Sequence, residues 1–189
     1  MQSIHFFAIA DERYVAERAW ERAVLGECPF HPEGGCGVSG HGSYPRVHPP
    51  GTRVARFLCA VAGRTISVLP AFLATRLSNT LDEIEAVVDA VETAPSIAAA
   101  ADVVRPADAE DAVTSISAAR WVRRRLTAVR AAVIALVTLV PELAGCAPTL
   151  VAVRARVGKG RALVTLRELG CAHISAIGPP LGLSNRGGR

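Results

Sequence analysis

The pattern of apolar and polar residues is most regular in the second half of the chain. Between residues 116 and 140, apolar residues recur at every third or fourth position, which predicts one face of an α-helix about 25 residues long. A second apolar face, at residues 81–91, follows cap-type residues and includes two early acids, as is typical of a helix start. Three shorter helices are expected at residues 97–104, 148–157 and 161–169.

The first half of the chain has a different pattern. Residues 11–25 have the composition of a helix that ends at Gly26, whereas residues 39–47 and 52–58 are typical of two strands joined by a His-Pro-Pro-Gly turn. The sequence therefore predicts an α+β fold. Its expected parts are a helical segment at 1–26, a small β-hairpin module at 27–75, a mostly helical domain at 76–177 and a flexible tail at 178–189.

Residues that bind metal ions lie at both ends of the predicted hairpin. Cys28 and His31 have the C-x2-H spacing that lets one tight turn direct two side chains to a single ion, and Cys36 follows two glycines. The second strand then ends at Cys59. Two groups of ligands joined by a hairpin are typical of a zinc ribbon, so we expect one tetrahedral Zn²⁺ site in this module.

The second ligand group is incomplete, because the position expected for a further cysteine is Ala62. In one interpretation His31 supplies the fourth ligand. In the other, the ribbon binds no metal, and its cysteines are small buried hydrophobic residues that hold the module by packing. We interpret the remaining residues of this type, Cys146, Cys171 and His173, as structural.

Several runs in the module resemble the zinc-ribbon segment of transposase-associated proteins, in a family whose ribbon precedes a helix-turn-helix. The resemblance covers residues 27–75 and rests on the Cys-Pro pair at 28–29, the runs at 41–46 and 63–70, and the basic strand ending at Cys59. The family's Cys-x-x-Cys-Gly-Arg-Thr motif is matched except at Ala62. The resemblance implies binding of double-stranded DNA linked to mobile elements, with contacts from the ribbon arginines Arg46, Arg53 and Arg56.

The composition adds an excess of arginine. The chain has a net charge of +4, and Lys159 is its single lysine. Arginine suits phosphate recognition, although a GC-rich genome gives the same bias. Four residues crowd the start of the longest predicted helix, where a recognition helix would contact DNA: Arg120, Trp121, Arg123 and Arg124. They also fit a solvated helix face, and the segment at 105–115 is longer than the turn of a helix-turn-helix.

Other classes of function are less well supported. The most apolar run, at residues 131–140, is too short to span a membrane, and no secretory signal is recognised, so we expect a cytoplasmic protein with unpaired cysteines. We find no grouping of residues typical of an enzyme. The alternative to DNA binding is a protein-interaction module whose long helix pairs with a second copy or with a transposase partner.

Overall fold

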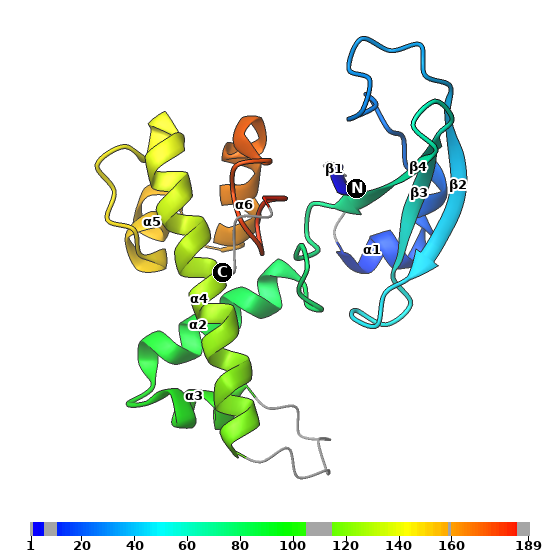
Figure 1. The fold of residues 1–189 in the computed structure, drawn as a ribbon. Helices are drawn as coiled ribbons and strands as arrows, with labels where there is room; N and C mark the ends of the chain where they lie inside the picture. Colours follow the sequence, from blue (N-terminus) through cyan, green and yellow to red (C-terminus); the bar gives the residue numbers. More distant parts are fainter. Residues whose placement is uncertain (1, 6–10, 105–114, 159, 185–189) are drawn as a thin grey trace. The chain divides into compact units, whose positions relative to one another are not determined.

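The computed structural model describes residues 2–5, 11–104, 115–158 and 160–184 (Figure 1). The chain divides into two compact units, Met1–Thr80 and Leu81–Arg189. The first unit contains the sheet and the second is helical, so the predicted α+β class is confirmed. None of the helices in the described ranges is both long and apolar enough to cross a membrane.

The first unit is built on a four-stranded sheet. Strands β2 (Val38–Pro45), β3 (Arg53–Cys59) and β4 (Arg64–Pro70) pair antiparallel, which confirms the predicted hairpin. Strand β1 (Gln2–His5) pairs parallel to β4, giving the order β1-β4-β3-β2. The sequence had predicted a helical segment at 1–26, so a strand at its beginning is a correction.

The helix predicted at residues 11–25 is broken into two short pieces. Helix α1 covers Asp11–Ala16, and a 3₁₀ helix, η1, covers Ala19–Arg22. Arg18 between them has a left-handed backbone with φ of 50°, a conformation that a continuous α-helix does not contain. Tyr14 and Trp20 nevertheless share one core, with ring centroids 5.8 Å apart.

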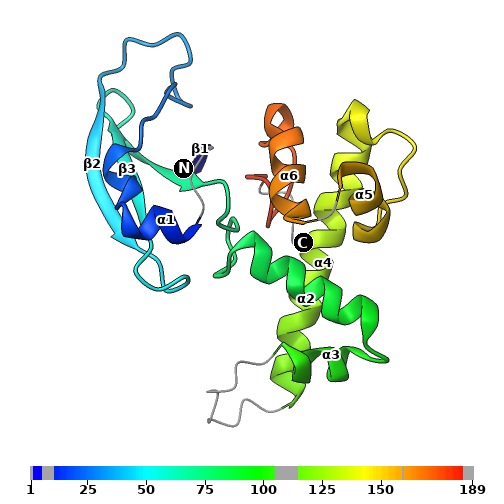
Figure 2. The same cartoon turned by 180° about the vertical axis from the view of Figure 1, so that it is seen from behind.

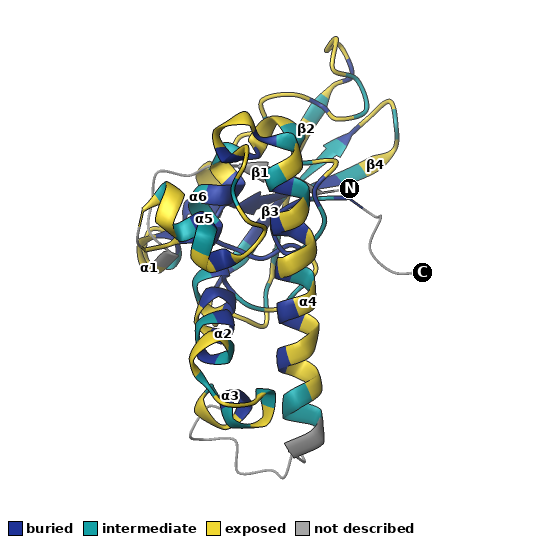
Figure 3. Cartoon of the chain, turned by 90° about the vertical axis from the view of Figure 1, so that its left-hand side faces the viewer, coloured by how far each residue is buried: buried dark blue, intermediate teal, exposed yellow. Residues whose placement is uncertain are grey.

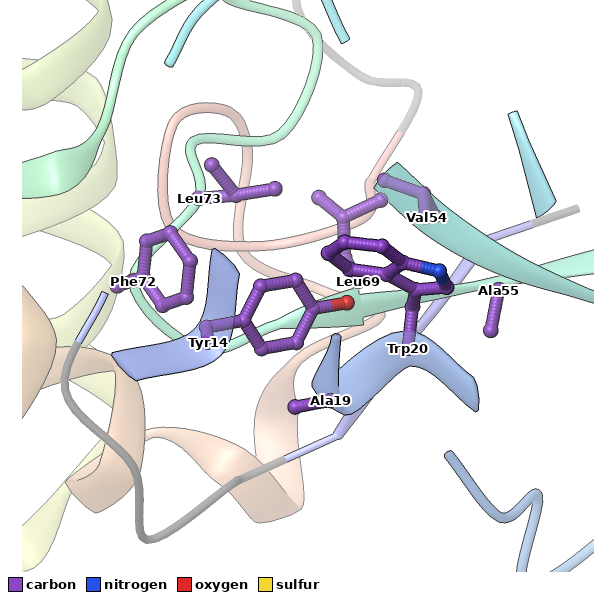
Figure 4. Close-up of a cluster of buried hydrophobic side chains, with 8 residues drawn as sticks. All are labelled: Tyr14, Ala19, Trp20, Val54, Ala55, Leu69, Phe72 and Leu73. Atoms are coloured by element: carbon purple, nitrogen blue, oxygen red, sulfur yellow. The ribbon is translucent and has the colours of Figure 1, made fainter. Parts of the chain in front are cut away.

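That core holds α1 and η1 to the sheet. Figure 4 shows Tyr14 and Trp20 beside residues from β3, β4 and the segment that follows β4. The Tyr14 hydroxyl donates a hydrogen bond of 3.0 Å to the Arg53 carbonyl oxygen, so this buried side chain has a polar partner. Aromatic packing therefore stabilises the first unit at this end of the sheet.

The second unit contains the helices that the sequence predicted. They are α2 (Leu81–Thr93), α3 (Ile97–Val103), α4 (Ser115–Leu139), α5 (Leu150–Val157) and α6 (Ala162–Leu169), with short 3₁₀ helices η2 (Pro141–Leu143) and η3 (Cys171–His173). Figure 2 shows α3 near the beginning of α4, and α5 and α6 near its end. Residues 105–114, which make up most of the long segment expected between α3 and α4, lie outside the described residues.

Helix α4 is the longest element in the described ranges, and it buries one side from Val122 to Leu136. In Figure 3 its buried positions lie on the side towards α2 and α3, and exposed positions cover the opposite side. The buried positions repeat at the spacing expected from the sequence: Val122, Leu126, Val129, Val133 and Leu136. The helix therefore forms the centre of the second unit, as its apolar face predicted.

The residues predicted to begin a flexible tail are packed. Leu181 is fully buried, and the guanidinium of the equally buried Arg167 donates to the carbonyl oxygens of Leu181, at 2.8 Å, and Pro180. The Ser184 amide also donates to the Ile177 carbonyl oxygen. Residues 178–184 therefore belong to the second unit, and residues 185–189 lie outside the described part of the chain.

Candidate metal centre

The four predicted metal ligands come together in the first unit. The candidate ligand atoms of Cys28, His31, Cys36 and Cys59 all lie within 4.8 Å of one another. His31 Nδ1 is 3.4 Å from Cys59 Sγ and 3.8 Å from Cys28 Sγ. The three cysteines are buried and His31 is half-buried. One Cys₃His set of this kind has the ligand types and the number of ligands that a tetrahedral zinc ion requires.

Two consecutive turns place the first three ligands. The His31 amide donates to the Cys28 carbonyl oxygen, and the Gly34 amide donates to the His31 carbonyl oxygen, each at 3.0 Å. Gly34 and Gly35 then have φ of 84° and 74°, which is a left-handed backbone that favours glycine. The chain can therefore reverse within a few residues and return Cys36 to the side chains of Cys28 and His31.

The remaining candidate ligand, Cys59, is held by the sheet. Cys59 ends β3 and is paired with Val38 on β2 and Arg64 on β4. The Ala62 amide donates to Cys59 Sγ at 3.4 Å, so the turn after β3 provides a hydrogen bond to the sulfur although it offers no second ligand. His31 Nδ1 also lies 3.4 Å from Cys59 Sγ, in agreement with the interpretation in which His31 supplies the ligand that is missing at position 62.

The environment has opposite effects on two of the thiols. Burial alone would raise the pKa of Cys28, but hydrogen bonds from His31 and from the backbone amides of Phe30 and His31 lower this pKa to about 6. Burial, together with the neighbouring sulfurs of Cys28 and Cys59, raises the pKa of Cys36 to about 11. Near neutral pH the metal-free site therefore favours the thiolate at Cys28 and the thiol at Cys36.

The cluster is apolar on one side and open on the other. Ile66 is buried against the three cysteines, and the half-buried residues packed around them include Phe30, Phe57 and Ala62. On the open side, a hollow of about 280 Å³ is lined by Cys28, His31 and Cys36 and by the glycine loop between them. Cys59 does not line this hollow. Solvent therefore reaches the site from the side of the loop.

The predicted DNA-contacting arginines of the ribbon are half-buried and have partners within the first unit. Arg46 donates to the carbonyl oxygens of Ala74, at 3.3 Å, and Leu77, at 2.7 Å. Arg53 donates twice to Ser43, and Arg56 donates to Thr65. These arginines help to hold the hairpin and the segment after β4 in place. Their contact with DNA stays a prediction.

The predicted residues on α4 have a different environment. Arg120, Arg123 and Arg124 are exposed, and no residue in the described ranges forms an ion pair with them. Trp121 is 37% exposed, and the guanidinium of the buried Arg125 lies 3.6 Å from the centre of its ring. Burial lowers the pKa of Arg125 to about 10. Sequence reasoning missed this cation–π pair, although its i, i+4 spacing on a helix was a usable signal.

The other cysteines take no part in the cluster. Cys146 is half-buried and Cys171 is exposed, and both are free thiols in the second unit. Comparisons of this chain with family models, with curated proteins and with solved structures gave no match.

Proposed function

We propose that this protein is a zinc-binding, DNA-binding protein without catalytic activity of its own, in which Cys28, His31, Cys36 and Cys59 hold one structural zinc ion. The observation that carries the proposal is the convergence of these four ligand atoms within 4.8 Å. Four protein ligands leave no open coordination position, and this is the arrangement of structural rather than catalytic zinc. The zinc would fix the glycine loop to the end of β3 and so compensate for the small core of the module.

The distribution of charge supports an anionic partner. Residues 38–80 contain no acidic residue but five arginines: Arg46, Arg53, Arg56, Arg64 and Arg76. Helix α4 also lacks acidic residues and contains five arginines. Three of them, at positions 120, 123 and 124, are exposed on its first turns. Arginine side chains of this kind bind phosphates, and DNA is the polyanion that the sequence resemblance favours. The link to transposition rests on that resemblance alone.

Duplex binding as a function of salt tests the DNA part of the proposal. We expect the zinc-loaded chain to bind a labelled duplex, with an affinity that falls as salt rises. Replacing Arg120, Arg123 and Arg124 by alanine should reduce the slope of log affinity against log salt by about 0.9 for each phosphate that is no longer neutralised. Fluorescence anisotropy at several salt concentrations measures this slope.

A matched control removes the same charge elsewhere. Arg13, Arg18 and Arg22 are exposed and form ion pairs with Glu17 and Glu21 at the N-terminal end of the first unit. Their triple alanine variant should keep most of the salt slope. If the two triple variants lose the salt slope equally, only the net charge of the chain affects binding, and the arginines of α4 have no special role. If the unsubstituted chain binds no duplex at low salt, the DNA-binding proposal is contradicted.

A second candidate function is favoured by the apolar residues exposed on α4. Ile134 is 53% exposed, and it shares this helix with the partly exposed Trp121. Docking of α4 against another helix would bury an exposed apolar residue such as Ile134. If the protein is an interaction module of this type, it should form a stable oligomer that an Ile134→Lys substitution dissociates. Light scattering coupled to size-exclusion chromatography distinguishes this from a monomer.

A further inference from the structure

The three thiols of the candidate metal centre differ in accessibility and in freedom to move. Cys28 and Cys36 are 6% and 5% exposed and line the open hollow, whereas Cys59 is fully buried. Cys59 is also fixed between β2 and β4 and accepts a hydrogen bond from the Ala62 amide. A small oxidant that enters the hollow therefore meets Cys28 and Cys36 first.

The chain between these two cysteines has room to adjust. A Cβ atom placed on Gly34 or Gly35 would meet no other atom within 4 Å. The sulfurs of Cys28 and Cys36 already lie within 4.8 Å, and a disulfide requires them to approach to about 2.05 Å. The glycine loop can move to bring about this approach without breaking the ladder that holds Cys59.

We propose that Cys28 and Cys36 form a disulfide in response to a peroxide, and that this oxidation releases the zinc ion. The inference concerns the regulation of the proposed zinc centre and rests on that proposal. With Cys28 and Cys36 joined, only His31 and Cys59 remain as ligands. A structural zinc site needs four ligands, so the ion is lost and the loop is no longer fixed to β3.

The oxidation balances with hydrogen peroxide as the oxidant. Cys28 Sγ attacks one peroxide oxygen, the O–O bond breaks, and Cys28 becomes a sulfenic acid as water leaves. Cys36 Sγ then attacks Cys28 Sγ and displaces the hydroxide, which leaves as a second water. The two thiolates lose two electrons in total, the peroxide gains them, and two protons from solvent complete the two waters.

The test uses the full chain as purified, treated with hydrogen peroxide in the presence of a chromogenic zinc indicator. We expect about one zinc ion per chain to be released, with loss of two free thiols. Peptide mapping should identify the Cys28–Cys36 crosslink. Adding a dithiol reductant and zinc should restore the starting state. Cys171→Ser removes an exposed thiol outside the cluster and should change neither readout.

A second variant tests the assignment of the pair. Cys36→His retains four ligands but lacks the second thiol, so it should bind zinc and form no crosslink with Cys28. If Cys36→His does not fold, peptide mapping of the unsubstituted chain still shows which two cysteines are crosslinked. A crosslink that includes Cys59, or zinc that stays bound after the thiols are oxidised, would overturn the inference while leaving the zinc centre intact. A preparation without zinc before peroxide is added would overturn the proposed centre, and the inference with it.

Discussion

Ala62 occupies the position at which the sequence resemblance predicts a second cysteine after Cys59. Its amide donates to Cys59 Sγ, and its methyl group packs against the buried cysteines. The nitrogen of His31 lies 3.4 Å from the same sulfur. In the proposed zinc centre, His31 would therefore take the place of the ligand that the turn after Cys59 lacks.

If His31 supplies the ligand that is missing at position 62, a cysteine at this position should compensate for the loss of His31. His31→Ala should lower the affinity for zinc by at least about tenfold, or 1.4 kcal/mol, because three thiolates remain. Adding Ala62→Cys to this variant should restore most of the affinity, since the new sulfur starts beside Cys59. Competition with a chromogenic chelator measures both affinities. If the double variant binds zinc no better than His31→Ala alone, Ala62 does not mark the missing ligand position.

The two perturbed thiols predict how zinc binding depends on pH. Zinc binds thiolates, and in the metal-free protein Cys36 keeps its proton up to a pKa of about 11. Zinc must displace that proton, so the apparent affinity should rise with pH by at least about one log unit per pH unit near neutrality. Below about pH 6 the curve should steepen, because Cys28 is then protonated as well. Isothermal titration calorimetry with zinc, at several values between acid and neutral pH, measures this affinity. An affinity that does not change with pH would contradict the prediction.

At the scale of elements, Gly170, directly after α6, lies against α4 and against the segment that follows η3. A Cβ atom at this position would lie 2.4 Å from Leu136 Cδ2 and 2.9 Å from Ile177 Cδ1. Both side chains are fully buried, so neither can move easily. The absence of a side chain at Gly170 lets α4 and the segment after α6 approach each other.

Gly170→Ala should therefore destabilise the protein by about 1–3 kcal/mol through overpacking. The backbone φ of −85° at Gly170 is allowed for alanine, so the loss of stability would come from side-chain contacts and not from backbone strain. Gly178→Ala is the matched control, because a Cβ atom there meets nothing within 4 Å. Urea unfolding followed by circular dichroism compares the two variants. Equal stability of both would show that the contact at Gly170 relaxes freely.

The elements also show which features a single sequence predicts. Helix α4 was predicted well because its apolar period extends over many turns. Strand β1 was missed because it has only four residues and its partner, β4, begins about 60 residues later. The break at Arg18 was missed because residues on both sides favour a helix, and no local pattern shows that Tyr14 and Trp20 pack into one core with residues of β3 and β4.

At the scale of the whole molecule, the convergence of the candidate metal ligands was easier to predict from sequence than the contacts of the arginines. Cys28, His31 and Cys36 are close in sequence, and one hairpin is enough to bring Cys59 to them. The roles of the arginines depend instead on contacts between distant segments. Arg46 binds carbonyl oxygens about 30 residues away, and Arg167 is completely buried beside Leu181. No local pattern distinguishes these residues from the exposed arginines of α4.

Each unit has its own source of stability. The second unit is centred on α4, and Arg154 joins α5 to α2 through ion pairs with Glu85 and Asp89. The first unit has its aromatic core at one end of the sheet, and its other cluster consists largely of cysteines. The proposed zinc ion would stabilise this cysteine cluster, and the proposed function depends on it.

The zinc content of the purified chain, measured by elemental analysis, tests the proposed zinc centre most directly. We expect about one zinc ion per chain, lost in Cys59→Ser and retained in Cys171→Ser, which removes a thiol outside the cluster. A folded chain without zinc, or equal zinc content in the two variants, would contradict the metal centre. The buried cysteines would then act only by packing.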